Sequence, residues 1–284
     1  MLGMGIMGRQ MAARIARAGF PTRVWNRTAR DCEPAISAGV HASATIAEAI
    51  AGATIVVIMV STGEAVDEVL FAPDGVAAAA KPACRVIVMS SIPPATARDQ
   101  ATRLAKTGLV YLDAPVSGGE VGARNGSLSI LVGGPEEDFD LIRPLLQTMG
   151  RPSHIGPVGS GQVAKLVNQT IVGITIAAVA EAALLAKAAG ADPGRVFAAL
   201  AGGFADSAVL RIHGPRMVAA DFTPGARAST QLKDLRTAQS LAIHAGLNLP
   251  TLHTVETLYA AMCANGLADL DHSGLYAWLE RQVF

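Results

Sequence analysis

The chain has 284 residues, of which 51% are hydrophobic and 16% charged, and its 23 basic residues balance its 23 acidic ones. This composition supplies ample apolar material for a core and too little charge for a disordered chain. The balanced charge argues against a general nucleic-acid binder and a polybasic membrane binder. Three widely spaced cysteines, with no CxxC and no histidine at metal spacing, predict neither a disulfide framework nor a metal site, and they fit a reducing cytoplasm.

The first half of the chain alternates short apolar runs with helical patterns. The run 54–60 (TIVVIMV) is rich in β-branched residues, which is typical of a strand buried on both faces. The alternation predicts a mostly parallel, doubly wound α/β sheet with helices on both faces. The expected strands are 23–25, 54–60, 85–89, 109–113 and 128–132, and the expected helices are 7–18, 94–106 and 136–147.

Strand patterns end at about residue 156, and a single long helix is expected over 161–189. Its middle (IVGITIAAVA) is apolar all round, which predicts burial on all sides and suggests that subunits associate as a homodimer or homotetramer. Its apolar stretch, 166–180, is too short for a membrane span. We therefore predict an α/β domain over 1–156 and an all-α domain over 157–284, joined by the long helix. Further helices are expected at 193–201, 227–244, 250–264 and 273–281.

A GxGxxG pattern, GMGIMG, begins at the third residue and opens the first helix. In dinucleotide-binding folds the first glycine permits a tight turn, the second lets a pyrophosphate approach the backbone, and the third lets the helix pack closely. The helix N-terminus adds N–H donors and the positive end of a dipole. Gly3, Gly5, Ile6, Met7 and Gly8 are therefore candidate cofactor-binding residues of a Rossmann-type sheet. A merely structural glycine turn is the alternative.

Only Met1 and Leu2 precede the first glycine. The first strand of a Rossmann-type sheet lies at its centre, and a typical strand has about five to six residues. We therefore expect a truncated first strand, either because translation starts upstream or because residues have been removed. The glycine turn is then expected to be loosely anchored.

The second predicted strand ends in Trp25-Asn26-Arg27-Thr28. An acidic residue at this point of the fold binds the ribose 2′-hydroxyl of NAD, whereas an Arg accommodates the 2′-phosphate of NADP. No acid stands here, and the guanidinium of Arg27 matches phosphate geometry. Asn26, Arg27 and Thr28 are therefore candidate cofactor-binding residues, and NADP is expected over NAD. A solvated surface Arg27 is the alternative.

A glycine-rich loop follows the predicted strand 109–113, in the sequence DAPVSGG. Ligands bind at the carboxyl edge of open α/β sheets, where this loop is expected. Ser117 offers a hydroxyl, and Gly118 and Gly119 can turn two backbone N–H groups toward an anion. These three residues are a candidate cradle for a substrate carboxylate, and an ordinary loop is the alternative.

The long helix begins in GSGQVAKLVNQ, where Lys165, Asn168 and Gln169 are spaced to share one helical face. A desolvated Lys has a lowered pKa and can exchange a proton near neutrality, which Arg cannot. Lys165 is therefore a candidate acid/base. The alternative is that Lys165 extends its ammonium to solvent and has no catalytic role.

These four motifs in this order resemble the β-hydroxyacid dehydrogenases, whose members include 3-hydroxyisobutyrate dehydrogenase, tartronate semialdehyde reductase and glyoxylate/succinic semialdehyde reductase. The resemblance covers essentially the whole chain. It implies that Lys165 is the catalytic acid/base, that Asn168 contacts the substrate, and that Ser117, Gly118 and Gly119 hold its carboxylate. The pair Lys233-Asp234 matches a second family motif, which implies a role for Lys233 toward substrate and cofactor.

The same resemblance implies that the loop 89–93 lies near the nicotinamide, and it adds Val60, Ser61 and Ser91 to the candidate cofactor-binding residues. Many relatives carry two consecutive asparagines after the catalytic lysine, whereas this chain has Asn168-Gln169. That form, together with Asp271-His272-Ser273, resembles the tartronate semialdehyde (2-hydroxy-3-oxopropionate) reductase branch. Gln169 is therefore a candidate substrate-binding residue.

The expected reaction is reversible hydride transfer between NADPH and a small aldehydo or keto acid, with Lys165 donating or accepting the proton. The alternatives are a 3-hydroxyisobutyrate dehydrogenase, a succinic semialdehyde/glyoxylate reductase, an imine reductase, and a non-catalytic NADP(H)-binding module. Lys165 weighs against the last two. Five of the six histidines are expected at the surface or at helix ends, and only His272 is a candidate to line the pocket.

Overall fold

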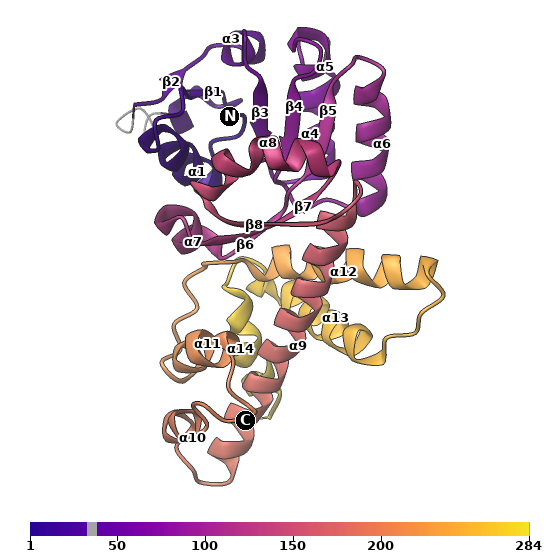
Figure 1. Ribbon diagram of the computed structural model, residues 1–284. Coiled ribbons are helices and arrows are strands. Elements are labelled where there is room, and N and C mark those ends of the chain that lie inside the picture. The colour runs from indigo at the N-terminus through magenta and orange to yellow at the C-terminus, as the bar shows by residue number, and fades with distance from the viewer. Residues whose placement is uncertain (33–38, 284) are drawn as a thin grey trace. The chain divides into compact units, whose positions relative to one another are not determined.

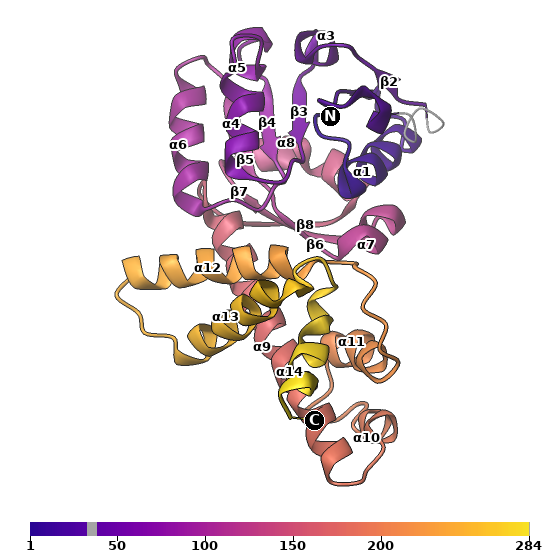
Figure 2. The same cartoon turned by 180° about the vertical axis from the view of Figure 1, so that it is seen from behind.

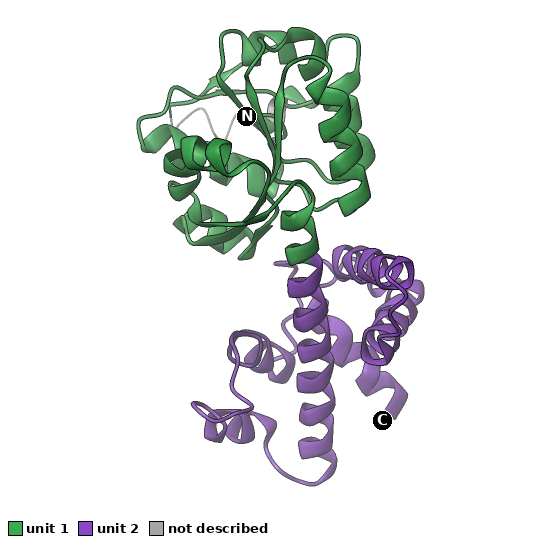
Figure 3. Ribbon diagram, turned by 45° about the vertical axis from the view of Figure 1, so that its right-hand side comes forward, with its two compact units in different colours: residues 1–165 green, residues 166–284 purple. Residues whose placement is uncertain are grey.

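The computed structural model describes residues 1–32 and 39–283, and the chain divides into two compact units, Met1–Lys165 and Leu166–Phe284 (Figure 3). The division falls within helix α9 (Ser160–Ala188), whereas the sequence predicts a boundary at 156. The first turn of this helix is bonded to the sheet of the first unit, as described below, which explains the later division.

Unit 1 contains a six-stranded sheet in the order β3-β4-β5-β7-β6, with β8 pairing β7. Pairs β3–β4, β4–β5 and β7–β8 are parallel, and β7 runs antiparallel to β5 and β6. A separate parallel pair joins β1 to β2. The strands are β1 (Arg23–Val24), β2 (His41–Ala42), β3 (Ile55–Ile58), β4 (Arg85–Val88), β5 (Val110–Asp113), β6 (Val116–Ser117), β7 (Leu128–Gly133) and β8 (Gly150–Gly156).

Apolar side chains alternate between the two faces of this sheet and form two core clusters. Val56 and Ile58 pack with residues of α3 to α6, whereas Val57 packs with residues of α1 and α8. These helices are labelled around the sheet in Figure 1. The predicted doubly wound sheet is therefore confirmed. The helices of this unit are α1 (Ile6–Arg17), α3 (Ile46–Ile50), α4 (Gly63–Phe71), α5 (Val76–Ala79), α6 (Pro94–Ala105), α7 (Gly119–Asn125) and α8 (Glu136–Gln147), with a 3-10 turn, η1 (Ala29–Cys32).

The first strand consists of little more than Leu2, which lies between β1 and β3. Its N–H donates to the Val57 carbonyl at 2.8 Å, and its carbonyl accepts from the Met59 N–H at 2.9 Å. On the other side the Gly3 N–H donates to the Trp25 carbonyl at 2.9 Å. The short first strand thus has the central place that the glycine motif predicts.

An open cavity of about 320 Å³ lies beside Met1. The N-terminal ammonium is buried there and donates to the carbonyl of Arg23. Burial, reinforced by the charge of Arg23, lowers the pKa of this amine to about 5. The side chains and backbone lining the cavity come from the ends of α1, β1 and β3, including Ile15, Phe20 and Ile55.

Unit 2 has no strand among its described residues, which confirms the predicted all-α fold. Its core cluster includes Ile176 and Ala180 of α9, Leu235 of α12 and Tyr259 of α13. These packed residues account for much of the apolar composition of α9, which is long and apolar enough to span a membrane by length and composition. The other helices are α10 (Pro193–Ala199), α11 (Ala208–Val218), α12 (Ala228–His244), α13 (Pro250–Met262) and α14 (Leu275–Val283) (Figure 2).

The prediction that α9 is buried on all sides is wrong. Ile171 is 61% exposed and Leu185 is 72% exposed. Both lie on a stripe that the core residues of unit 2 leave open, because Ile176 and Ala180 point the opposite way into the cluster.

Candidate active site

The glycine turn has the geometry of a dinucleotide-binding loop. Gly3 has a φ of +94°, and a Cβ there would lie 2.2 Å from the Met59 carbonyl oxygen and 2.8 Å from Val60. A Cβ at Gly8 would lie 1.9 Å from the Gly3 carbonyl oxygen, whereas a Cβ at Gly5 meets nothing within 4 Å. The first and third glycines therefore serve close packing, and Gly5 leaves open space at the N-terminus of α1. That space fits the pyrophosphate of a dinucleotide, whose charge the helix end favours.

Hydrogen bonds of Asn26 connect this turn to the end of β1. Its Oδ1 accepts from the Met4 N–H at 2.9 Å, and its Nδ2 donates to Asp31 Oδ2 at 2.9 Å and to the Thr28 carbonyl at 3.1 Å. Asp31 thus places a carboxylate next to Asn26, although the local sequence pattern has no acid directly after the strand. Arg27 is exposed, with Glu68 3.8 Å away.

The loops after two neighbouring strands, β3 and β4, meet at the carboxyl edge of the sheet. The Val60 N–H, after β3, donates to Ser90 Oγ at 2.9 Å, after β4. The Ser90 carbonyl in turn accepts from Gln162 Nε2 at 2.9 Å, and Gln162 Oε1 accepts from the Ile92 N–H at 3.1 Å. Gln162 is fully buried near the start of α9, so it joins the helix to the loop after β4. Ser61 is exposed beside Val60, and Ser91 follows Ser90.

Asp113, at the end of β5, holds the N-terminus of α9. Its Oδ1 accepts from the Gly159 N–H at 2.7 Å and its Oδ2 from the Gln162 N–H at 2.8 Å. These donors have no partner within the helix, and the helix dipole favours a negative charge at this end. Burial raises the pKa of Asp113, and the two backbone hydrogen bonds oppose that shift.

Glycines allow this close docking. A Cβ at Gly161 would lie 2.3 Å from the Leu131 carbonyl oxygen, and a Cβ at Gly133 would lie 2.5 Å from Asp113 Oδ1. Backbone and carboxylate atoms cannot move away as a flexible side-chain end can. The GSGQ sequence before the candidate lysine is therefore required by the contact of α9 with β5 and β7.

Lys165 follows Gln162 by three residues on α9, and it is buried with 9% of its surface exposed. The helix on which it stands is fixed at the carboxyl edge of the sheet by Asp113 and Gln162. Ligands of open α/β sheets bind at this edge. A buried ammonium at that place is suited to proton exchange with a bound substrate.

The predicted carboxylate cradle lies between β6 and α7. Ser117 ends β6 and pairs with Ser129 of β7, and Gly118 and Gly119 have φ values of +131° and +60°. Gly118 is exposed and Ser117 and Gly119 are half-buried, so the loop is accessible. Glycine adopts such positive φ values without steric cost, so the two glycines allow this loop, which remains a candidate cradle for a carboxylate.

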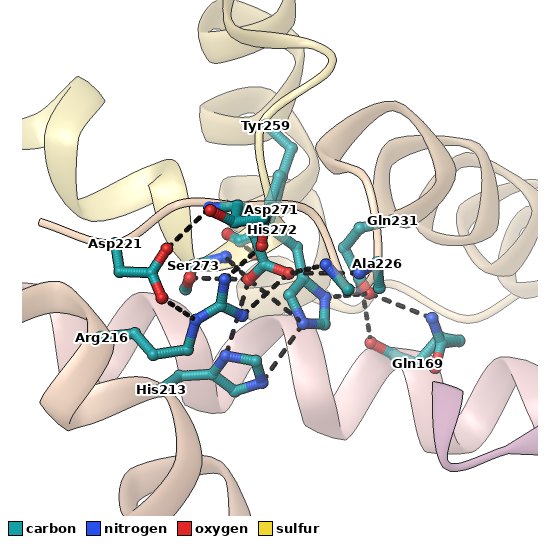
Figure 4. Close-up of polar contacts among 12 residues, drawn as sticks. Gln169, His213, Arg216, Asp221, Ala226, Gln231, Tyr259, Asp271, His272 and Ser273 are labelled. Carbon is teal, nitrogen blue, oxygen red and sulfur yellow. Dashed lines mark hydrogen bonds and ion pairs between the residues drawn. The ribbon is translucent and has the colours of Figure 1, made fainter. Parts of the chain in front are cut away.

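A polar cluster in unit 2 includes Gln169 of α9 together with Gln231 and His272 (Figure 4). Asn168 Nδ2 donates to Gln169 Oε1 at 2.9 Å, and Gln169 Nε2 donates to Gln231 Oε1 at 3.0 Å. His272 Nδ1 lies 3.5 Å from Gln231 Oε1, and its Nε2 lies 3.3 Å from His213 Nε2. The cluster therefore extends from Asn168 to a pair of imidazoles. Lys233 of α12 lies 3.1 Å from its neighbour Asp234.

The ligand atoms of His213, Asp271 and His272 lie within 4.8 Å of one another. Asp271 Oδ1 accepts from the Ser273 hydroxyl at 2.7 Å, and Oδ2 lies 3.1 Å from the Arg216 guanidinium. Although burial opposes its ionisation, the hydrogen bonds from Ser273 and from the Ala226 N–H, together with His272, lower the pKa of Asp271 below its usual range. Hydrogen bonds and one cation thus satisfy this carboxylate, and the arrangement needs no metal ion.

Three residues that organise the site are absent from the predicted set. Asp113 appears in the sequence only as the start of the DAPVSGG motif, and Gln162 and Gln231 have no motif of their own. A signal for Asp113 exists, because an acid that ends an apolar strand must be paired when buried. His213, expected at the surface, is half-buried against His272, with their ring centroids 4.7 Å apart.

Two family models match the chain. Residues 1–172 match the NAD binding domain of 6-phosphogluconate dehydrogenase, and residues 159–279 match the model described as NAD-binding of NADP-dependent 3-hydroxyisobutyrate dehydrogenase. Both matches agree with the glycine turn and with the two units of the structure.

Curated relatives and solved structures agree with these models over nearly the whole chain. The 2-hydroxy-3-oxopropionate reductase of Escherichia coli is 42% identical over 98% of this chain and 96% of that protein. The NAD-dependent L-serine dehydrogenase of Pseudomonas aeruginosa is 31% identical over 96% of this chain and 94% of that protein.

Among solved structures, the Mycobacterium tuberculosis 3-hydroxyisobutyrate dehydrogenase with L-serine superposes with a TM-score of 0.89 at 32% identity, covering 98% of this chain and 97% of that one. The glycine turn, the helix that carries Lys165 and the matches to two family models lead to one conclusion. The chain belongs to the β-hydroxyacid dehydrogenases, oxidoreductases that use a nicotinamide cofactor.

Proposed function

We propose that the protein is an NADP-dependent reductase of a short aldehydo acid, with 2-hydroxy-3-oxopropionate as its substrate. The observation that carries the proposal is the buried Lys165 on a helix that Asp113 fixes at the carboxyl edge of the sheet. The identity with the Escherichia coli reductase and the Asn168-Gln169 pair support this substrate.

The glycine turn and the loop after β3 would hold the cofactor. Gly3, Gly5 and Gly8 shape the space for the pyrophosphate, and Val60 packs against Gly3. A bound nicotinamide cofactor supplies the hydride that reduces the substrate carbonyl.

The remaining steps belong to side chains of this chain. Ser117 and the backbone N–H groups of Gly118 and Gly119 would bind the substrate carboxylate, which fixes the carbonyl in one orientation. Lys165 would donate a proton to the developing alkoxide oxygen and would accept it again in the reverse direction. Such positioned acid catalysis typically contributes ~10²–10⁴-fold to a rate.

Two observations bear on the choice between NADP and NAD. Arg27 is exposed at the end of β1, and its ion pair with Glu68 is exposed on both sides, so it exchanges easily for a phosphate contact. Asp31, beside Asn26, is the acid that would favour NAD. We propose NADP because the guanidinium of Arg27 is accessible, whereas Asp31 is engaged by Asn26.

The decisive experiment is a turnover assay with NADPH and NADH against a panel of acids. The panel contains 2-hydroxy-3-oxopropionate, succinic semialdehyde and glyoxylate for reduction, and 3-hydroxyisobutyrate and L-serine, which are assayed for oxidation with NADP⁺ and NAD⁺ instead. We expect the highest kcat/KM with NADPH and 2-hydroxy-3-oxopropionate. A higher kcat/KM for any other member would reassign the substrate, and no turnover on the whole panel would favour a non-catalytic module.

We also propose that the protein is a cytoplasmic homo-oligomer that associates through unit 2. Ile171 and Leu185 form an exposed apolar stripe on α9, and Phe204 and Ile212 are exposed as well. Apolar patches of this kind mark association surfaces. Light scattering of the purified protein tests the proposal, and a mass of one chain at micromolar concentration would reject it.

A further inference from the structure

Gln231 makes two hydrogen bonds to the same residue of α9. Its Nε2 donates to the main-chain carbonyl of Gln169 at 2.9 Å, and its Oε1 accepts from the Gln169 side chain at 3.0 Å. Gln231 is buried, with 1% of its surface exposed. A Cβ at Gly173, one turn along α9, would lie 2.8 Å from Gln231 Nε2. Gly173 therefore provides the space that this contact needs.

These contacts fix which end of each amide faces its neighbour. A main-chain carbonyl only accepts, so the Gln231 atom facing the Gln169 carbonyl must be Nε2. Oε1 of Gln231 is then the other end, and it must accept from Gln169 Nε2. Gln169 Oε1 consequently faces Asn168, and the Asn168 atom that meets it at 2.9 Å must be the donor Nδ2. The orientation of the Asn168 amide thus follows from one main-chain carbonyl three contacts away.

With one of its two N–H donors given to Gln169, Asn168 has the acceptor Oδ1 and a second N–H for a ligand, and the same contacts fix where Oδ1 lies. An acceptor binds a hydroxyl, which donates, and gains nothing from a hydrogen or a methyl group in its place. Among the candidate substrates, 2-hydroxy-3-oxopropionate carries a hydroxyl on the carbon next to the reacting aldehyde. The same acid without that hydroxyl, 3-oxopropanoate, leaves Oδ1 without a partner, which costs binding in a desolvated site.

We propose that Gln231 is a positioning residue for substrate selection. It fixes the Asn168 amide with Oδ1 as acceptor, and the site thereby favours acids with a hydroxyl next to the reacting carbonyl. This inference rests on the proposed function, because it assumes that Asn168 meets the substrate. His272 Nδ1 lies 3.5 Å from the same Gln231 Oε1, and in the tautomer with the proton on Nδ1 it reinforces this orientation.

The test compares two substrates that differ only in that hydroxyl. Wild type and Gln231→Met are assayed with NADPH against 2-hydroxy-3-oxopropionate and 3-oxopropanoate. We expect wild type to favour the hydroxylated acid by about tenfold or more in kcat/KM. In Gln231→Met the ratio should fall to about threefold or less through a loss on the hydroxylated acid, with the Kd for NADPH unchanged.

Gln100→Met is the matched control, because Gln100 is a fully buried glutamine of α6 with two side-chain partners, Asp67 and Tyr111. It should lower the Tm and leave the substrate ratio unchanged. In an Asn168→Ala background, Gln231→Met should have no further effect on the ratio, since residues that act in series are not additive.

If Gln231→Met does not fold, Gly173→Ala displaces the same amide without removing it and should lower the ratio in the same direction. Equal losses on both acids, an unchanged ratio, or an additive effect with Asn168→Ala would overturn the role of Gln231. A wild type that turns over neither acid would instead reject the proposed function, and this inference with it.

Discussion

The two successive turns of α9 that carry the candidate catalytic groups are held in different ways. The turn before Lys165 is bonded through backbone N–H groups to one buried carboxylate, Asp113. The turn with Asn168 is oriented through side-chain amides that end at Gln231. A backbone anchor tolerates changes of side chain but requires glycines, whereas an amide chain can be altered by single substitutions. We therefore expect the position of Lys165 to withstand side-chain substitutions nearby, and the orientation of Asn168 to change with single substitutions.

The largest effect is expected at Lys165. Lys165→Met should lower kcat by ~10²-fold or more, because the proton donor is lost. Lys165→Arg should fail equally, because Arg stays protonated at neutral pH. NADPH binding, measured by fluorescence titration, should remain as in wild type. Retention of more than about a tenth of the wild-type rate in either variant would contradict the acid/base role.

Asp113→Asn tests the backbone anchor. The amide nitrogen of the new side chain would face the N–H group of either Gly159 or Gln162. One buried hydrogen bond would be lost, because two donors would then face each other. We expect a loss of ~2–3 kcal/mol in the free energy of unfolding and a kcat lowered by about tenfold through displacement of Lys165. Urea unfolding and steady-state kinetics measure the two effects.

Asp138→Asn is the control for this anchor, because Asp138 is buried on α8 and pairs with Arg85 at 2.7 Å, away from α9. It should lower stability without lowering kcat. If Asp113→Asn kept kcat within about twofold of wild type, Asp113 would stabilise the fold without positioning the lysine.

Arg27→Ala addresses the exposed end of β1 in unit 1. We expect NADPH to bind more weakly by ~1.5–3 kcal/mol, the contribution of a charge-assisted contact to the 2′-phosphate. NADH kinetics should hardly change, and the substrate ratio should stay constant. Equal efficiency of wild type with the two cofactors would refute the NADP assignment.

The stability of the protein should depend on pH through His213, which lies at the end of the polar cluster away from Asn168. Burial lowers the pKa of His213, while Asp271 opposes that shift and Arg216 adds to it. Below its unfolded pKa of about 6.5, the unfolded chain binds the proton more readily than the folded one. Stability should therefore fall as the pH drops from 6.5 through the lowered folded pKa.

His213→Asn should remove this part of the pH dependence. The measurement is urea unfolding of both proteins across mildly acidic and neutral pH, and the quantity compared is the difference between the two curves. The neighbouring His272, Asp271 and Arg216 are present in both proteins. Parallel curves would show that His213 does not titrate differently in the folded state.

The smallest catalytic effect is expected from an extension of about four apolar β-forming residues before Met1, a typical strand being only slightly longer. The added strand would fill the cavity beside Met1 and remove the buried ammonium, so the Tm should rise, NADPH should bind more tightly, and kcat should not change. The amine, whose pKa is lowered to about 5, makes the present chain lose stability as the pH falls from 8 toward 5. A chain that melts and binds no better after extension would contradict this account.

Periodic and glycine signals predicted the regular parts of the molecule. Helix α9 begins and ends within one residue of its predicted bounds, because a glycine follows its apolar pattern. Strand β8 was missed, since its residues GRPSHIG alternate between exposed and half-buried positions and form no apolar run. Short helices such as α3 and α4 were missed for a similar reason, although Thr45 and Thr62 cap them.

In the candidate site, the sequence predicted only those residues whose type or local motif points to a function by itself. Lys165 and the glycines stand out in the sequence, and the structure places Lys165 at the sheet edge. Gln231 contacts Gln169 across 62 positions of the chain, and Asp113 reaches Gln162 across 49. Such contacts depend on the packing of distant segments, which no local spacing reveals. The sequence therefore indicated candidates for the reacting groups, and the structure was needed to find what orients them.

The two hydrogen bonds of Asp113 define the rotational phase of α9 as well as its depth. An α-helix turns by about 100° per residue, so the angle at which Lys165 leaves the helix is set by its distance in sequence from Gln162. One residue inserted between Gln162 and Lys165 would rotate the lysine side chain about the helix axis by about 100° while the anchor stayed intact. The number of residues between Gly161 and Lys165 therefore sets the direction in which the lysine side chain leaves the helix. An insertion or deletion in this segment changes that direction, whereas a substitution in it need not.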